Sequence, residues 1–229
     1  MRTVVLLSGG LDSAVGLKCA LDDTDVVLCL TFDYGQRAAE REAAAARTMC
    51  GRFGVDYRLV ALPWLAGLTS TALVDTSHDL PEPTSDRLDD TAASRESAAA
   101  VWVPNRNGAF IAIGAAFAES LDAEGLVAGF NAEEAATFPD NSADFVAATN
   151  AALARSTQNH VRVICYTQHL TKAEIAALGR EIEAPIDLAW PCYREGPELC
   201  GRCESCRRFE RALRASGNWE WYRSARTAA

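Results

Sequence analysis

The segment 8–13, Ser-Gly-Gly-Leu-Asp-Ser, combines flexible and hydroxyl-bearing residues in the pattern of a phosphate-binding loop. Its glycines let the backbone approach an anion without a Cβ clash, so that backbone N–H groups can point together at phosphate oxygens. Ser8 and Ser13 add hydroxyl donors. Asp12 is acidic, and an acid in an anion site fits a role in orienting the loop or in holding a metal ion that accompanies the phosphates.

This loop differs from two widespread nucleotide loops. The kinase and GTPase loop needs a lysine after its second glycine, and the dinucleotide fingerprint needs Gly-x-Gly-x-x-Gly, and the segment has neither pattern. Ser-Gly-Gly-x-Asp-Ser instead resembles the loop of the N-type ATP pyrophosphatases, which cleave ATP between its α and β phosphates. The resemblance implies that ATP, with Mg²⁺, is bound by Leu7, Ser8, Gly9, Gly10, Leu11, Asp12, Ser13, Ala14, Val15, Gly16 and Leu17.

Four of the eight cysteines lie within fifteen residues near the C-terminus, with the spacing Cys-x7-Cys-x2-Cys-x2-Cys. Zinc takes four sulfur ligands tetrahedrally, and a closed set of four leaves no position for water. We therefore expect one structural zinc ion per chain, bound by Cys192, Cys200, Cys203 and Cys206. An iron–sulfur cluster is the stronger alternative, and two disulfides are the weaker one. The scattered cysteines are expected to be core thiols: Cys19, Cys29, Cys50 and Cys165.

Apolar runs rich in β-branched residues alternate along the chain with helical patterns, and these elements must position the loop and the cysteines. The predicted strands are residues 3–7, 26–32, 57–62, 101–103, 126–130 and 161–165, and the predicted helices are 11–21, 37–53, 106–121 and one after a capping box at Thr171. This alternation predicts an α/β fold with a doubly wound, mostly parallel sheet. We expect a single domain over residues 1–229 that includes a zinc-binding loop and helix at 190–215, and a long polar loop at 75–100.

Composition excludes several classes of function. The chain has 22 Lys+Arg against 31 Asp+Glu and a net charge of −9, which disfavours nucleic-acid partners. Five arginines between 202 and 214 are interleaved with glutamates and predict a solvated helix face. The longest apolar run, 109–118, is about half of the ~20 residues that a membrane helix needs, and the run at 4–7 is too short for a signal peptide. We therefore expect a cytoplasmic protein without a membrane partner.

Together, the loop and the cysteine cluster resemble the 7-cyano-7-deazaguanine synthases. The resemblance extends over residues 4–213, and its matching pieces are 6–13, 32–37 (Phe-Asp-Tyr-Gly-Gln-Arg), 103–107 (Val-Pro-Asn-Arg-Asn) and Cys192-Tyr193 with the later cysteines. It implies an adenine nucleotide α-hydrolase-like fold. It also implies that 7-carboxy-7-deazaguanine, ammonia and ATP are converted to the nitrile through an adenylated carboxylate and an amide.

Adenylation makes the carboxylate reactive, because it replaces an oxide leaving group with AMP. The protein must then position the reactants and neutralise the charge that develops on the phosphate. The resemblance and the positions along the chain suggest four catalytic residues, Asp12, Ser13, Arg106 and Lys172, the last in a Lys-x-Glu element found in the family. The expected substrate contacts are Tyr34, Gln36, Arg37, Arg106, Asn107 and Asp140. We expect a homodimer because such enzymes are commonly homodimers.

One segment departs from the family's pattern. Residues 137–142 read Thr-Phe-Pro-Asp-Asn-Ser, where bacterial members usually carry Gly-Tyr-Pro-Asp-Cys-Arg, so an arginine and a tyrosine hydroxyl are missing. The alternatives that stay open are a ligase of this superfamily that acts on a different carboxylate, a tRNA thiolase, and a non-enzymatic zinc module. A thiolase needs a catalytic cysteine pair and an RNA-binding surface, which the isolated Cys29 and Cys165 and the net charge of −9 do not support.

Overall fold

The computed structural model describes residues 1–88 and 90–227. Its centre is a five-stranded sheet in which all neighbouring strands are parallel, in the order β3-β2-β1-β4-β5. The strands are β1 (Arg2–Leu6), β2 (Asp25–Asp33), β3 (Tyr57–Ala61), β4 (Gly125–Val127) and β5 (Arg162–Ile164). Five of the six predicted strands are thus confirmed, and they form the doubly wound sheet that the alternating pattern indicated.

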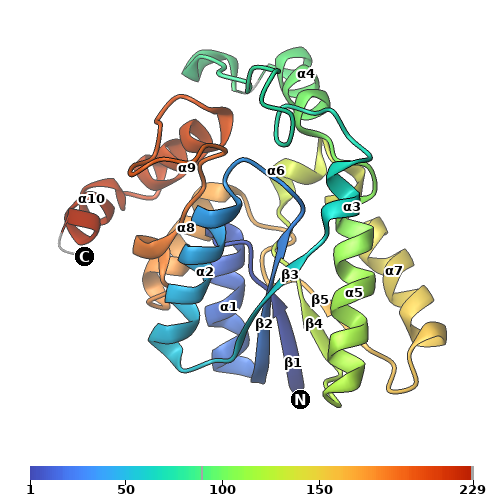
Figure 1. The fold of residues 1–229 in the computed structure, drawn as a ribbon. Coiled ribbons are helices and arrows are strands. Elements are labelled where there is room, and N and C mark those ends of the chain that lie inside the picture. The colour runs from blue at the N-terminus through green and yellow to red at the C-terminus, as the bar shows by residue number, and fades with distance from the viewer. Residues whose placement is uncertain (89, 228–229) are drawn as a thin grey trace.

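Helices cover both faces of the sheet (Figure 1). Successive strand residues point to opposite faces, so Val4 packs in one apolar cluster with Ile111, whereas Val5 packs in the other with Val15. The first cluster lies under α5 (Arg106–Ser120) and α7 (Ala143–Ser156). The second lies under α1 (Leu11–Asp23), α2 (Ala39–Phe53) and α8 (Lys172–Glu181).

Two helix ends follow the signals that the sequence contains. Gly54 ends α2 in the left-handed conformation, with φ of 68°, and its N–H donates to the carbonyl of Cys50. Thr171 and Glu174 form both hydrogen bonds of the capping box at the start of α8. These local signals are strong because each satisfies backbone groups that the helix itself leaves unpaired.

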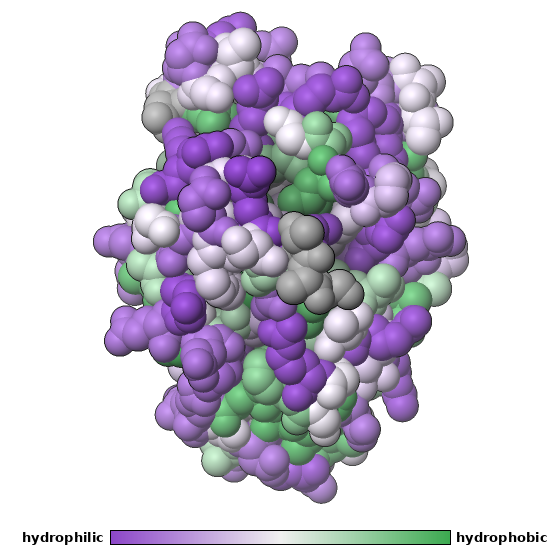
Figure 2. All heavy atoms as spheres, turned by 90° about the vertical axis from the view of Figure 1, so that its left-hand side faces the viewer, coloured by the Kyte–Doolittle hydropathy of each residue, from purple (hydrophilic) through white to green (hydrophobic). Residues whose placement is uncertain are grey.

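The remaining elements are α3 (Pro63–Ala66), η1 (Ser85–Arg87), α4 (Thr91–Val101), α6 (Ala132–Ala135), η2 (Pro139–Asn141), η3 (Ile186–Leu188), α9 (Glu204–Ala215) and α10 (Trp219–Thr227). Most of them lie above the sheet or, as α9 and α10 do, to its left in Figure 1. Within the described residues, no helix has both the length and the apolar character to cross a membrane. Figure 2 shows that hydrophilic side chains cover most of the face on which α9 and α10 lie.

Two expectations between β3 and α5 need correction. The segment 75–100 is not wholly a loop, because α4 occupies its last part. The predicted strand at 101–103 is wrong: Val101 ends α4, and Val101 and Val103 are buried in the core beside the sheet without joining it. A short apolar run requires burial, and periodicity alone does not distinguish a strand from a buried helix end.

The strand order places a crevice at the carboxyl ends of β1 and β4. The chain leaves β1 toward β2 on one side, and it later returns to β4 on the other. Ligands of open α/β sheets bind at such a switch point. The residues directly after β1 and directly after β4 are therefore placed to contact a ligand.

Candidate active site and metal centre

The predicted phosphate loop joins β1 to α1 at this crevice. The N-cap residue of α1, Gly10, makes no side-chain cap hydrogen bond, which leaves the first N–H groups of the helix open to an anion. The hydroxyl oxygens of Ser8 and Ser13 lie 3.1 Å apart. Gly9 has a φ of 81°, and a Cβ there would lie 2.7 Å from the carbonyl oxygen of Glu42, so only glycine fits.

A cavity of about 290 Å³, which we call the loop cavity, opens beside this loop. Part of the predicted ATP-binding run lines it, namely Leu7, Ser8, Gly10, Leu11, Asp12 and Ser13. The next four residues, 14–17, are buried in α1 and do not line it, and neither does Gly9. The backbone after β4 forms the opposite wall: a Cβ on Gly129 would lie 2.9 Å from the backbone nitrogen of Ser13.

Three charged side chains from distant parts of the chain meet on the wall of the loop cavity. The ammonium Nζ of Lys172 lies 2.8 Å from Oδ2 of Asp12 and 2.8 Å from Oε1 of Glu134. Burial opposes the charge of Lys172, but the two carboxylates outweigh it and raise the pKa of the lysine. Burial likewise opposes the charge of Glu134, and Lys172 overcomes it and lowers the pKa of that carboxyl.

Asp12 itself remains incompletely paired. Burial raises the pKa of Asp12, an effect that Lys172 offsets in part. Its Oδ1 atom is buried and has no hydrogen-bond partner among the described residues. A buried carboxylate oxygen without a donor is costly unless a ligand completes it.

Asn131 supports this group and was not among the predicted site residues. It is fully buried, and its Nδ2 donates to Oδ2 of Asp12 over 3.0 Å. Its Oδ1 accepts the backbone N–H of Glu134 and so caps α6. The sequence signal for this residue was a potential N-cap asparagine two positions before Glu133-Glu134.

Aromatic side chains form another part of the cavity wall. Arg106, at the start of α5, donates to the hydroxyl of Tyr34 over 3.2 Å, and its guanidinium lies 5.8 Å from the centre of that ring. Phe110 stacks on Phe32 with ring centres 4.3 Å apart. Burial raises the pKa of Tyr34, so the phenol stays protonated. The arrangement offers a flat apolar surface with a cation at its edge.

The other predicted substrate contacts after β2 lie differently. Gln36 lines the cavity, but its amide is used inside the protein: Nε2 donates to Phe32 and to Glu42, and Oε1 accepts the N–H of Tyr34. Burial raises the pKa of Glu42 to about 7. Arg37 does not line the cavity, because its guanidinium binds the backbone carbonyl oxygens of Asp75 and His78.

The segment that departs from the family's pattern also borders the cavity. Asn107 lines it and donates to the backbone carbonyl of Asp140 over 3.3 Å. Phe138 lines it as well and stacks on Trp102, with ring centres 6.1 Å apart. The hydroxyl of Ser142 accepts the N–H of Phe145 and caps α7.

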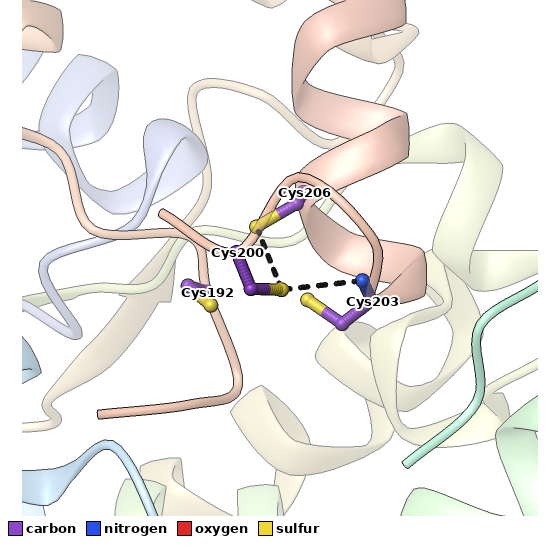
Figure 3. A group of neighbouring side chains, drawn as sticks. All are labelled: Cys192, Cys200, Cys203 and Cys206. Atoms are coloured by element: carbon purple, nitrogen blue, oxygen red, sulfur yellow. Dashed lines mark hydrogen bonds between the residues drawn. The ribbon is translucent and has the colours of Figure 1, made fainter. Parts of the chain in front are cut away.

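The four C-terminal cysteines form one cluster. Their sulfur atoms all lie within 4.8 Å of one another, and the side chains point toward a common centre (Figure 3). Cys203 is the N-cap of α9 and Cys206 lies in its first turn, whereas Cys192 and Cys200 come from the preceding loop. In a tetrahedral site with 2.3 Å bonds the sulfur atoms are about 3.8 Å apart. The cluster can therefore hold a metal ion.

The loop that carries Cys192 and Cys200, together with α9, holds the segment between β3 and α4. Arg194 forms an ion pair with Glu82 over 2.8 Å, and the N–H of Glu204 donates to the carbonyl of Pro81. Arg208 donates to the carbonyl of Leu88 and pairs with Glu204 over 2.8 Å. Its side chain is only 18% exposed, so the prediction of a wholly solvated arginine face is wrong at this position.

The scattered cysteines are core thiols only in part. Cys29 and Cys50 are buried, as predicted, whereas Cys19 and Cys165 are partly exposed. All four are free, and so are the thiols of the cluster. The disulfide alternative is therefore not the arrangement that the structure adopts.

Comparisons with known proteins agree with the site. Residues 2–217 match the family described as "Queuosine biosynthesis protein QueC". Three similar relatives, each aligned over 95% of this chain, are called 7-cyano-7-deazaguanine synthase: those of Pelotomaculum thermopropionicum (55% identical, 98% of that protein covered), Desulforudis audaxviator (52%, 98%) and Desulforamulus reducens (51%, 95%). The chain belongs to the QueC family of queuosine biosynthesis proteins.

Proposed function

We propose that this protein is an ATP-dependent nitrile synthase that converts 7-carboxy-7-deazaguanine and ammonia into 7-cyano-7-deazaguanine. The names of relatives with 51–55% identity support this reaction. The observation that carries the proposal is the position of Lys172, between Asp12 and Glu134 on the wall of a cavity that begins at the phosphate loop. An ammonium group there can neutralise charge that develops on a phosphate during adenylation.

ATP would bind with its phosphates on the loop and its adenine against the aromatic wall. The uncapped first turn of α1 and the hydroxyls of Ser8 and Ser13 supply donors to the phosphates. Tyr34 and Phe110 supply flat surfaces for a purine ring. The buried Oδ1 of Asp12, which has no donor, fits a ligand of Mg²⁺, and the ion would neutralise charge on the departing pyrophosphate.

The first chemical step is adenylation of the acid. A carboxylate oxygen attacks the α-phosphorus of ATP, the bond to the β-phosphate oxygen breaks, and pyrophosphate leaves. Lys172 stabilises the phosphate charge, and the loop holds the pyrophosphate. Ammonia then attacks the acyl carbon, AMP leaves with the carboxylate oxygen, and a proton is released to give the amide.

A second ATP activates the amide in the same site. The amide oxygen attacks the second α-phosphorus, pyrophosphate leaves, and loss of AMP together with both amide protons gives the nitrile. Both activations need the same positioning, so one set of residues can perform them. Each nitrile formed therefore consumes two ATP, one ammonia and one acid.

The cysteine cluster would hold zinc in a structural role. Four thiolate donors satisfy a tetrahedral zinc ion and leave no position for water or substrate. The backbone N–H groups of Cys203 and Arg194 donate to the sulfurs of Cys200 and Cys192, which offsets part of their negative charge. The ion would fix α9 and the segment that α9 holds.

The test is product analysis with purified protein. ATP, Mg²⁺, ammonium and 7-carboxy-7-deazaguanine should yield AMP, pyrophosphate and a product with the mass of the nitrile. Asp12→Asn should abolish both AMP and nitrile formation while the protein stays folded, and Asp22→Asn, on the exposed end of the same helix, should not. If the wild-type protein forms no nitrile with this acid but consumes ATP with another carboxylate, the substrate assignment is wrong.

A further inference from the structure

A second cavity, of about 680 Å³, adjoins the loop cavity. The residues that line it come from α4, the end of α6, the start of α8 and one side of α9. Figure 1 shows where these helices lie. Thr91, Ala136, Thr171 and Ala215 lie on its walls and are exposed, so it opens to solvent. Its size is within the range of small-molecule sites.

The two cavities meet at a shared wall. Glu134, Lys172 and Tyr193 line both of them, together with Phe138 and Ser205. The phosphate loop lines the first cavity, and no residue of segment 8–13 lines the second. A nucleotide whose phosphates occupy the loop therefore leaves the second cavity free, with Lys172 at the junction.

The charged groups of the second cavity suit a ligand with two different ends. Its cationic side chains, Lys172, Arg208 and Arg211, form ion pairs with its carboxylates, Glu133, Glu134 and Glu204. A ligand with both kinds of group could replace part of this pairing. An aminopyrimidinone ring has adjacent N–H donors on one edge, which carboxylates accept, and a carboxylate substituent needs cations. The rings of Phe138 and Tyr193 add surfaces on which a planar heterocycle can stack.

We infer that the second cavity is the binding site of the acid substrate, a planar aminopyrimidinone heterocycle that bears a carboxylate. Its carboxylate would face Lys172 and the α-phosphorus at the junction, and its N–H edge would face the carboxylates on α6 and α9. The acid would thus enter from solvent between α4 and α9 without passing the nucleotide. This inference rests on the proposed function, and it moves the acid away from Tyr34 and Arg106, which remain with the nucleotide.

Filling the cavity from opposite walls tests this assignment. Ala136→Trp and Ala215→Trp place a large ring in the second cavity from α6 and from α9, at exposed positions outside the core. Each should raise the KM for the acid at least about tenfold and leave the KM for ATP within about twofold, because only one substrate loses its site. The affinity for a non-hydrolysable ATP analogue in the absence of acid should also stay unchanged.

Ala151→Trp is the matched control, because Ala151 is an exposed alanine on α7 that lines neither cavity. It should leave both KM values unchanged, and thermal unfolding shows which variants fold. An unchanged KM for the acid in a folded Ala136→Trp or Ala215→Trp variant, or a parallel rise of the KM for ATP, would overturn this inference but not the proposed function. A wild-type protein that makes no nitrile would instead overturn the proposed function.

Discussion

Asn131 donates a hydrogen bond of 3.0 Å to the carboxylate of Asp12, although 119 residues separate the two in the sequence. The same side chain caps α6, the short helix that carries Glu134. One buried amide thus fixes both carboxylates that flank Lys172. The position of these three charges therefore depends on a residue that need not touch a substrate.

Asn131→Ala should lower kcat by a larger factor than it raises the KM for either substrate. Misplacement of Asp12 lowers kcat by about 100-fold, since small displacements of catalytic groups have effects of that size. Loss of the cap also lowers the free energy of unfolding by about 1 kcal/mol. Steady-state kinetics and urea unfolding measure both quantities.

Asn150→Ala is the control for this variant. Asn150 is a partly buried asparagine that bonds the backbone of Val163 through both of its side-chain atoms, on the far side of the sheet from α1. Its loss should lower stability and leave kcat nearly unchanged. Equal kinetic effects of the two variants would mean that Asn131 acts only through stability.

Lys172→Met should abolish most of the activity. It removes the cation between two carboxylates, and we expect kcat to fall by about 100- to 1,000-fold. It also leaves Asp12 and Glu134 facing each other without compensation, which costs on the order of 3 kcal/mol of folding stability. Lys18, the other lysine of the chain, is paired with Asp22 at the surface, so Lys18→Met should change neither quantity much.

The stability of the protein should fall as the pH rises through neutrality because of Glu42. Burial raises its pKa to about 7 from an ordinary value of 4.5, so the folded protein binds this proton more tightly than the unfolded chain. The stabilisation is complete below pH 4.5 and is lost as the pH passes about 7. Relative to Glu42→Gln, the wild-type free energy of unfolding should drop by up to about 3 kcal/mol between pH 5 and 8. Parallel pH profiles of the two proteins would refute this assignment.

Removal of the proposed zinc ion should destabilise α9 and the segment that α9 holds. We expect one colourless zinc ion per chain in the wild type, and Cys203→Ser should lose it and unfold at a lower temperature. Cys19→Ser changes a partly exposed thiol outside the cluster and should keep the zinc. Iron and a brown chromophore in the purified protein would identify a cluster instead.

The parts of the site that are local in sequence could be predicted from sequence. The turn from β1 into α1 follows from glycines between a strand and a helix, and the cysteine cluster follows from four cysteines at short spacings. Lys172 was predicted as a catalytic residue. Its pairing with Asp12 was not predicted, because 160 residues separate the two. Only the fold brings the start of α1 next to the start of α8.

Other expectations failed or were incomplete because contacts made only in the folded chain decide them. Arg37 has the type and position of an anion-binding residue, yet nearby backbone carbonyls bind its guanidinium. The strand at 101–103 was inferred from apolar residues, and burial beside the sheet satisfies them without strand pairing. Asn131 has an ordinary capping signal, and only its depth in the fold shows that it also reaches Asp12.

Transfer of oxygen from the acid to AMP is the decisive measurement for the two adenylation steps. The acid is labelled with ¹⁸O at both carboxylate oxygens, and the AMP formed with ATP and ammonium is analysed by mass spectrometry. Adenylation followed by amide activation predicts two AMP for each nitrile, each with one ¹⁸O on its phosphate. Unlabelled AMP, or ADP and orthophosphate as the first products, would contradict the account.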